Sequence, residues 1–298
     1  MSLIKPIKWH GGKHYLASRI VSLMPPHTRY LEAYAGGLSV LLQKPFENCS
    51  EYVNDLDGEL TTFWQVLARP DLFDSFRRQV EAIPLSQPVF EVYRTLKGMC
   101  DSDDLDRAAV QKAVSFFVRN RQSRQGLGKD YCTPTKRLRR GMNENVSSWL
   151  TAVDGLPEIH ARLRRVEVLC RPATHVIARL DDEDLLVYAD PPYMHDTRST
   201  TKEYGDLEMS YADHVELLNT LSGMKGKFIL SGYQNDLYRH FADLGGWRRV
   251  DFDLPNNAAS GKTKKRMTES IWMNFEPADV DEPTKEFRGE QAKTSVQS

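Results

Sequence analysis

Asp184-Leu185-Leu186-Val187-Tyr188-Ala189 runs directly into Asp190-Pro191-Pro192-Tyr193. The first six residues are mainly apolar and partly β-branched or aromatic, which predicts a short buried strand. Proline has no N–H to donate to a ladder, so Pro191 and Pro192 end that strand at once. We therefore expect Asp190 and Tyr193 at the carboxyl end of a strand, where open α/β sheets bind ligands. An acid, a ring and carbonyl oxygens left free by the prolines suit a flat substrate with an amino group; the alternative is a structural turn.

Strands and helices alternate on both sides of this stretch. Short apolar runs predict further strands at residues 29–32, 51–54, 166–170, 226–231, 247–253 and 270–275. Helices are expected after Gly36-Gly37, through residues 40–42, and at residues 60–67, 211–222 and 234–243. The alternation predicts a doubly wound, Rossmann-like α/β sheet built from two separate parts of the chain, residues 1–60 and 165–276.

The intervening residues 61–164 are mostly helical in pattern, and we interpret them as a helical insertion with an exposed basic loop or hairpin over residues 119–141. That loop contains a single acid, Asp130. Its basic residues are Arg119, Arg121, Arg124, Lys129, Lys136, Arg137, Arg139 and Arg140. This distribution favours a nucleic-acid contact, and the alternative is an ordinary solvated basic face.

Two further polar segments lie near the end of the chain. Lys262, Lys264, Lys265 and Arg266 form a second basic cluster, which is either another phosphate contact or a surface loop. Residues 277–298 carry both charge signs and few large apolar groups, which predicts a disordered tail.

Composition limits the classes of protein to consider. The chain has 298 residues, 40% of them hydrophobic, and a net charge of −1, which is ordinary for a globular protein. No apolar run is long enough for a bilayer, and the first residues lack the pattern of a secretory signal. The four cysteines are far apart, which argues against a zinc site. His10, His195 and His214 have no acid at a diagnostic spacing. We expect a cytoplasmic protein with reduced thiols and no metal.

Two glycine-bearing segments suggest a cofactor site. Residues 8–13 place Trp9 and Lys13 around a glycine pair, which offers a stacking surface and a charge that can bind a carboxylate. Gly36-Gly37 follows the first predicted strand, where backbone N–H groups face the ligand edge of the sheet. Asp55 follows the next strand, where an acid commonly accepts hydrogen bonds from ribose hydroxyls. Asp57 is the better candidate for capping the helix that follows.

Taken in order, these motifs resemble those of the Dam-type (D12 class) adenine-specific DNA methyltransferases. The resemblance runs from about Ile4 to Phe275, and the basic insertion occupies the place of the family's target-recognition domain. It implies S-adenosyl-L-methionine as cofactor, with Trp9, Lys13, Gly36, Asp55 and Asp190 as its binding residues. One position departs from the family loop, which usually has a further glycine where this chain has Leu38. We expect Gly37 to supply the missing conformational freedom.

The resemblance also implies a chemistry. Asp190 and the carbonyl of Pro191 would accept the two hydrogens of adenine N6, and Tyr193 would stack on a base flipped out of duplex DNA. Arg119, Arg121, Arg124, Lys129, Lys136 and Arg137 would contact the DNA. A cognate restriction endonuclease in the same bacterial or phage system is a further expected partner.

Three other functions share parts of this pattern. An N4-cytosine DNA methyltransferase or an RNA adenine methyltransferase would keep the fold and the chemistry. Serine is common at the first motif position of the cytosine class, and asparagine in some RNA enzymes, so Asp190 favours DNA adenine. A DNA-binding regulator without catalytic activity is the third alternative, and the presence of Asp190 and Tyr193 argues against it.

Overall fold

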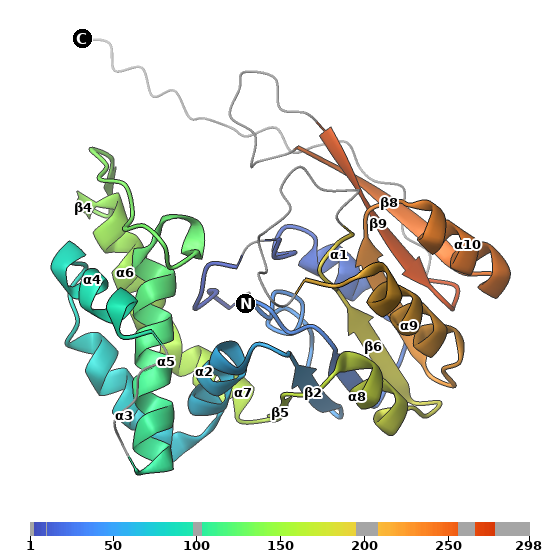
Figure 1. Ribbon diagram of the computed structural model, residues 1–298, viewed down its shortest axis with the longest axis horizontal. Coiled ribbons are helices and arrows are strands. Elements are labelled where there is room, and N and C mark those ends of the chain that lie inside the picture. Colours follow the sequence, from blue (N-terminus) through green and yellow to red (C-terminus); the bar gives the residue numbers. More distant parts are fainter. Residues whose placement is uncertain (1–2, 10, 98–102, 195–207, 256–265, 278–298) are drawn as a thin grey trace, which may run out of the picture.

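A computed structural model describes residues 3–9, 11–97, 103–194, 208–255 and 266–277. Its centre is a seven-stranded sheet in the order β5-β2-β1-β6-β7-β9-β8 (Figure 1). Neighbouring strands among the first five are parallel, whereas β9 is antiparallel to β7 and to β8. The strands are β1 (Arg29–Glu32), β2 (Ser50–Asn54), β5 (Val166–Leu169), β6 (Leu185–Ala189), β7 (Lys227–Gly232), β8 (Arg248–Pro255) and β9 (Arg266–Met273). The α/β class predicted from the sequence is confirmed, and the sheet is mixed, with most of its strands parallel.

The sheet is covered on both faces, which explains why β6 is apolar along its whole length. All five of its residues are buried, and they alternate between two cores. Leu185, Val187 and Ala189 face the core shared with α8 (Ala173–Leu180), α9 (Tyr211–Ser222) and α10 (Asp236–Gly245). Leu186 and Tyr188 face the other core, to which α1 (Ala17–Ser22) also contributes.

The helices between β2 and β5 share that second core. They are α2 (Gly58–Ala68), α3 (Pro70–Glu81), α4 (Gln87–Thr95), α5 (Leu105–Gln122), α6 (Glu144–Asp154) and α7 (Leu156–Leu163). Buried aromatic side chains such as Phe63, Phe76 and Phe117 join them to one another and to the sheet. Figure 1 shows α3–α6 gathered at one end of the molecule, on the side of β5 and β2. Residues 61–164 are thus mainly helical, while their assignment as an inserted target-recognition domain stays a prediction.

The basic loop predicted at residues 119–141 starts later than expected, because residues 119–122 belong to α5; the part after α5 contains a hairpin. A short 3₁₀ helix, η1 (Arg124–Gly126), comes first, and β3 (Leu138–Arg139) then pairs with β4 (Met142–Asn143). Arg140 and Gly141 both have positive φ, 56° and 74°. Positive φ at both central positions is typical of the type I′ turn that suits the twist of a two-residue hairpin.

The helix predicted after Gly36-Gly37 is wrong, because residues 36–44 form successive turns. Leu38 has a φ of 53°, which no right-handed helix contains. The N–H of Leu41 donates to Oε2 of Glu32 at 3.0 Å instead of to a helical carbonyl. Only isolated helix-like bonds remain, such as Leu42 N to Leu38 O at 3.1 Å.

Some expectations concern residues that the structure describes only in part. His10, His195, Lys262, Lys264, Lys265 and residues 278–298 lie outside the described residues. Within the described ranges, no helix is both long and apolar enough to cross a membrane.

Candidate active site

Asp190 lies where the order of the strands reverses. β1 pairs with β2 on one side and with β6 on the other, so the carboxyl ends of β1 and β6 flank the switch point of the sheet. Asp190 follows β6 directly, as predicted, and its carboxylate is bound by Lys13. The Lys13 Nζ lies 2.8 Å from Oδ1 and 3.0 Å from Oδ2, and it also donates to the Gly11 carbonyl at 3.0 Å.

Tyr193 is held beside this ion pair. Its hydroxyl donates to Asp190 Oδ1 at 3.2 Å and to Glu269 Oε1. The Lys13 Nζ lies 4.7 Å from the centre of its ring, and the ring of Tyr233 packs edge-on at 4.7 Å. Burial, together with the charges of Asp190 and Glu269, raises the pKa of the Tyr193 hydroxyl well above its usual value. The hydroxyl therefore stays a hydrogen-bond donor at neutral pH. Pro191, between the two, is buried.

Asp55 and the glycine turn form the second half of the site. Asp55 Oδ2 accepts from Gly36 N–H, and its Oδ1 accepts from Asp57 N–H, both at 3.0 Å. Burial raises the pKa of Asp55 above its usual range. Asp57 caps α2, with its Oδ1 accepting from Glu59 N–H and Leu60 N–H at 2.9 and 3.1 Å, which confirms its assignment as the cap.

Trp9 packs on the glycine turn. A Cβ at Gly36 would lie 2.6 Å from Trp9 Nε1, and one at Gly37 would lie 2.8 Å from Trp9 Cβ. Only glycine lets the indole approach this closely. Gly36 has a φ of 45° and Leu38 a φ of 53°, whereas Gly37 is not among the residues with positive φ. The expected role of Gly37 is therefore wrong: Leu38 itself adopts the left-handed conformation, and Gly37 makes room for Trp9.

Arg119 and Arg121 are the two predicted DNA-binding residues that the structure turns inward. Arg119 is 6% exposed, and its Nη2 pairs with Glu59 Oε1 at 2.8 Å. Arg121 Nη2 donates to the Ser148 carbonyl at 2.8 Å, and burial lowers the pKa of Arg121 to about 10. Both residues lie in the last turn of α5, which packs among α2, α3 and α4, so their guanidinium groups bind protein rather than face solvent.

The other predicted DNA-binding residues are exposed. They are Arg124, Lys129, Lys136 and Arg137, to which the hairpin adds exposed Arg139 and Arg140. Arg119 and Arg121 attach the end of α5 to its neighbours, so the segment with the exposed basic residues begins at a packed helix.

Glu269 and Tyr233 belong to the site but were not expected there. Glu269 lies on β9 just before the strand predicted at residues 270–275, and Tyr233 follows β7. The Glu269 side chain is 7% exposed, and burial raises its pKa to about 7 while Lys13 opposes the shift. The sequence around Glu269 contains no recognisable motif. Glu269 comes close to Tyr193 only because β9 pairs with β7, which the sequence did not indicate.

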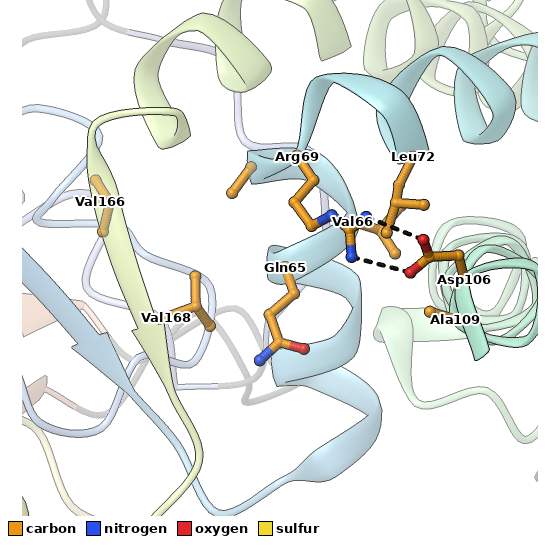
Figure 2. Close-up of a pocket in the computed structure, with 9 residues that line it drawn as sticks. Gln65, Val66, Arg69, Leu72, Asp106, Ala109, Val166 and Val168 are labelled. Carbon is orange, nitrogen blue, oxygen red and sulfur yellow. Dashed lines mark hydrogen bonds and ion pairs between the residues drawn. The ribbon is translucent and has the colours of Figure 1, made fainter.

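A hollow of about 490 Å³ lies elsewhere, beside the edge strand β5 (Figure 2). Val166 and Val168 line one side and Leu72 the other, while Arg69 at its rim is already paired with Asp106 at 2.9 Å. It shares no lining residue with the Asp190 site. Among the described residues, no group of three or more His, Cys, Asp or Glu side chains could hold a metal ion.

The fold and the position of the site are consistent with a methyltransferase. A family model of the D12 class N6 adenine-specific DNA methyltransferases matches residues 9–250. The chain belongs to this family.

Three relatives illustrate how far the similarity extends. The chain is 25% identical over 230 residues to a DNA N-6-adenine-methyltransferase of Escherichia phage P1, covering 72% of this chain and 27% of the relative. It is 23% identical over 241 residues to the type II methyltransferase M.FokI of Planomicrobium okeanokoites, covering 78% and 35%. It is 22% identical over 276 residues to a DNA adenine methylase of Salmonella typhimurium, covering 89% and 93%. The chain therefore spans roughly a quarter to a third of the first two relatives and nearly all of the third.

Proposed function

We propose that the protein transfers a methyl group from S-adenosyl-L-methionine to N6 of a flipped adenine in duplex DNA. The observation that carries this proposal is the cluster of Asp190, Tyr193 and Lys13 at the carboxyl end of β6, beside the switch point of the sheet. It puts an acceptor for amino hydrogens next to a ring suited to stacking. Membership of the D12 class supports the same activity.

The residues around the glycine turn fit the cofactor. Trp9 packs directly on Gly36 and Gly37, so the indole and the glycine turn form one surface on which the cofactor would lie. Asp55 keeps acceptor capacity beyond its two backbone bonds, which suits ribose hydroxyls. Lys13 lines the same side of the site and would contact the cofactor while its ammonium stays paired with a protein carboxylate. When bound, the cofactor supplies an electrophilic methyl group carried on a sulfonium.

The role of the protein is to make a weak nucleophile reactive. The N6 lone pair of adenine is delocalised into its ring, and hydrogen bonds from N6 to Asp190 and to the Pro191 carbonyl would favour a tetrahedral nitrogen. Held in this way, the amino group is aligned and its developing positive charge is stabilised. Asp190 then takes up the proton that the methylated nitrogen releases. No strong base is needed, because N6 becomes acidic only once it is methylated.

The exposed basic residues would hold the DNA. Arg124, Lys129, Lys136 and Arg137 are exposed and would make phosphate or base-edge contacts, whereas Arg119 and Arg121, whose guanidinium groups bind Glu59 and Ser148, would support the segment. Tyr193 would replace the stacking that the flipped base loses. A cognate restriction endonuclease is proposed only by analogy with the type II relative.

Incubation with labelled cofactor and mixed-sequence duplex DNA tests the proposal. We expect label in N6-methyladenine. Label found only in cytosine or only in RNA would favour one of the related methyltransferases. No transfer to any acceptor, combined with retained DNA binding, would identify a regulator of the same fold.

A further inference from the structure

Glu269 is a buried carboxylate with no role in the proposed chemistry. It lies on β9, opposite Phe252 of β8, and the next residue of β9, Ser270, pairs with Gly232 at the carboxyl end of β7. This register puts Glu269 at the same edge of the sheet as Asp190. A charged group is rarely buried at such a place unless its partners require it.

Glu269 and Asp190 share one cation. The Lys13 Nζ bonds to both oxygens of Asp190, at 2.8 and 3.0 Å, and lies 3.8 Å from Glu269 Oε1. Tyr193 joins the same two carboxylates through its hydroxyl. Two acids, one lysine and one phenol thus form a single network, in which the lysine is closer to Asp190.

This arrangement is unsuited to the reaction as it stands. Asp190 must offer charge to the amino group of adenine, but Lys13 neutralises that charge. Glu269 offers Lys13 a second anionic partner less than about 1 Å beyond hydrogen-bond range. A small movement of the lysine would therefore free Asp190 without leaving a buried ammonium group alone.

We propose that Glu269 is a positioning residue of the methyl-transfer site: it holds the Tyr193 hydroxyl and takes over Lys13 when Asp190 accepts the amino group of adenine. This inference rests on the proposed function. Glu269 acts only through Tyr193 and Lys13.

The proposal implies a dependence on pH. Glu269 attracts Lys13 only when ionised, and burial raises the pKa of Glu269 to about 7. The groups that face it from neighbouring segments are Lys13, Asp190, Tyr193, Tyr188 and Tyr233. The methyl-transfer rate should therefore rise as the pH passes through the neutral region.

Glu269→Gln tests this directly, because glutamine keeps an acceptor for Tyr193 but cannot attract Lys13 as a charge. We expect kcat to fall roughly tenfold at pH 8, with KM for DNA within about threefold of the wild type. The rise in rate between pH 6 and 8 should disappear. Glu269→Ala, which also removes the acceptor, should lower kcat further. Glu276→Gln is the matched control, since Glu276 is exposed and pairs only with Arg248 among the described ion pairs.

The outcomes separate the two proposals. If the wild-type protein methylates adenine and Glu269→Gln matches it in kcat at every pH, the inference is overturned while the proposed function stands. If the wild-type protein transfers no methyl group to adenine, the proposed function fails and the inference with it. Melting curves show whether Glu269→Ala folds; if it does not, the kcat of Glu269→Gln alone decides between these outcomes.

Discussion

At the scale of the residue, the site depends on one ion pair, between Asp190 and Lys13. Asp190 follows β6 at a position that two prolines fix, and Lys13 binds both of its oxygens. Its side chain is 19% exposed, so the carboxylate is open to a ligand from one side. This combination makes Asp190 the most direct target for mutation.

Asp190→Asn keeps the shape of the side chain and removes its charge. We expect kcat to fall by about 10²–10⁴-fold, because the amide cannot take the proton from N6. DNA affinity should stay within about threefold of the wild type. Asp184→Asn, at the other end of β6 and exposed, is the matched control. Retained methyl transfer in Asp190→Asn would exclude the assigned role.

Gly36 is the second residue at which a small change should have a large effect. Alanine there would need a φ of 45° and would bring its Cβ to 2.6 Å from Trp9 Nε1. We expect cofactor affinity to fall at least about tenfold and the melting temperature to fall by several degrees. Gly58→Ala is the control, because its Cβ would meet nothing within 4 Å. Calorimetric titration with the cofactor measures the first effect; an unchanged affinity would mean that Trp9 does not shape the site.

Glu32 gives a prediction about stability and pH. This buried acid, at the end of β1, accepts from Leu41 N–H at 3.0 Å, and burial raises its pKa to about 8. Because the unfolded chain loses this proton at lower pH than the folded one, the free energy of unfolding should fall as pH rises from about 4.5 to 8. Glu32→Gln has no proton to lose, so its melting temperature should exceed that of the wild type by more at pH 8 than at pH 5. A constant difference across this range would show that Glu32 is not protonated in the folded state.

At the scale of the element, the sequence predicted those elements that local pattern determines and missed those that long-range packing determines. The helix at residues 211–222 was predicted from its sequence pattern, and the buried strand ending at Ala189 from its continuous apolar run; both elements have clear ends. The turns at residues 36–44 were not, since Glu32 and the positive φ of Leu38 override the helical spacing of residues 40–42.

Residues whose roles depend on distant partners were the ones that sequence could not place. Arg119 pairs with Glu59, 60 positions away, and Arg121 binds Ser148 on α6. Glu269 reaches Tyr193 across 76 positions through the pairing of β9. In each case the residue type suggested solvent, and the tertiary fold supplied a protein partner that no local spacing encodes.

Two arginines of the basic segment, one exposed and one bound to protein, allow its proposed role in DNA binding to be tested. Arg124 is exposed on η1, while Arg121, three residues earlier, is bound to α6. If Arg124 contacts phosphate, Arg124→Ala should weaken DNA binding and reduce the slope of log K against log salt by about 1. Arg121→Ala should instead lower the melting temperature, because the Ser148 carbonyl loses its donor. If Arg124→Ala left the slope of log K against log salt unchanged, Arg124 would not be a phosphate contact.

At the scale of the whole molecule, the segments proposed to bind the cofactor and the DNA are joined. Asn120, near the end of α5, accepts from Lys8 N–H at 2.8 Å and donates to the Lys8 carbonyl at 2.7 Å. It also donates to Gly126 of η1 at 3.1 Å. Lys8 Nζ in turn binds the carbonyls of Arg121 and Ser123. Asn120 thus connects the segment that contains Trp9 to the start of the basic segment through hydrogen bonds.

We therefore expect Asn120→Ala to weaken two functions that lie on different elements. Losing three hydrogen bonds should cost about 1–3 kcal/mol in the free energy of unfolding. Because the freed segments carry Trp9 on one side and Arg124 on the other, cofactor and DNA affinity should both fall several-fold. Asn219→Ala, an exposed asparagine on α9, is the control. Binding of each ligand, measured alone and in the presence of the other, distinguishes a shared scaffold from separate sites: if only DNA affinity fell, Trp9 would be held independently of α5.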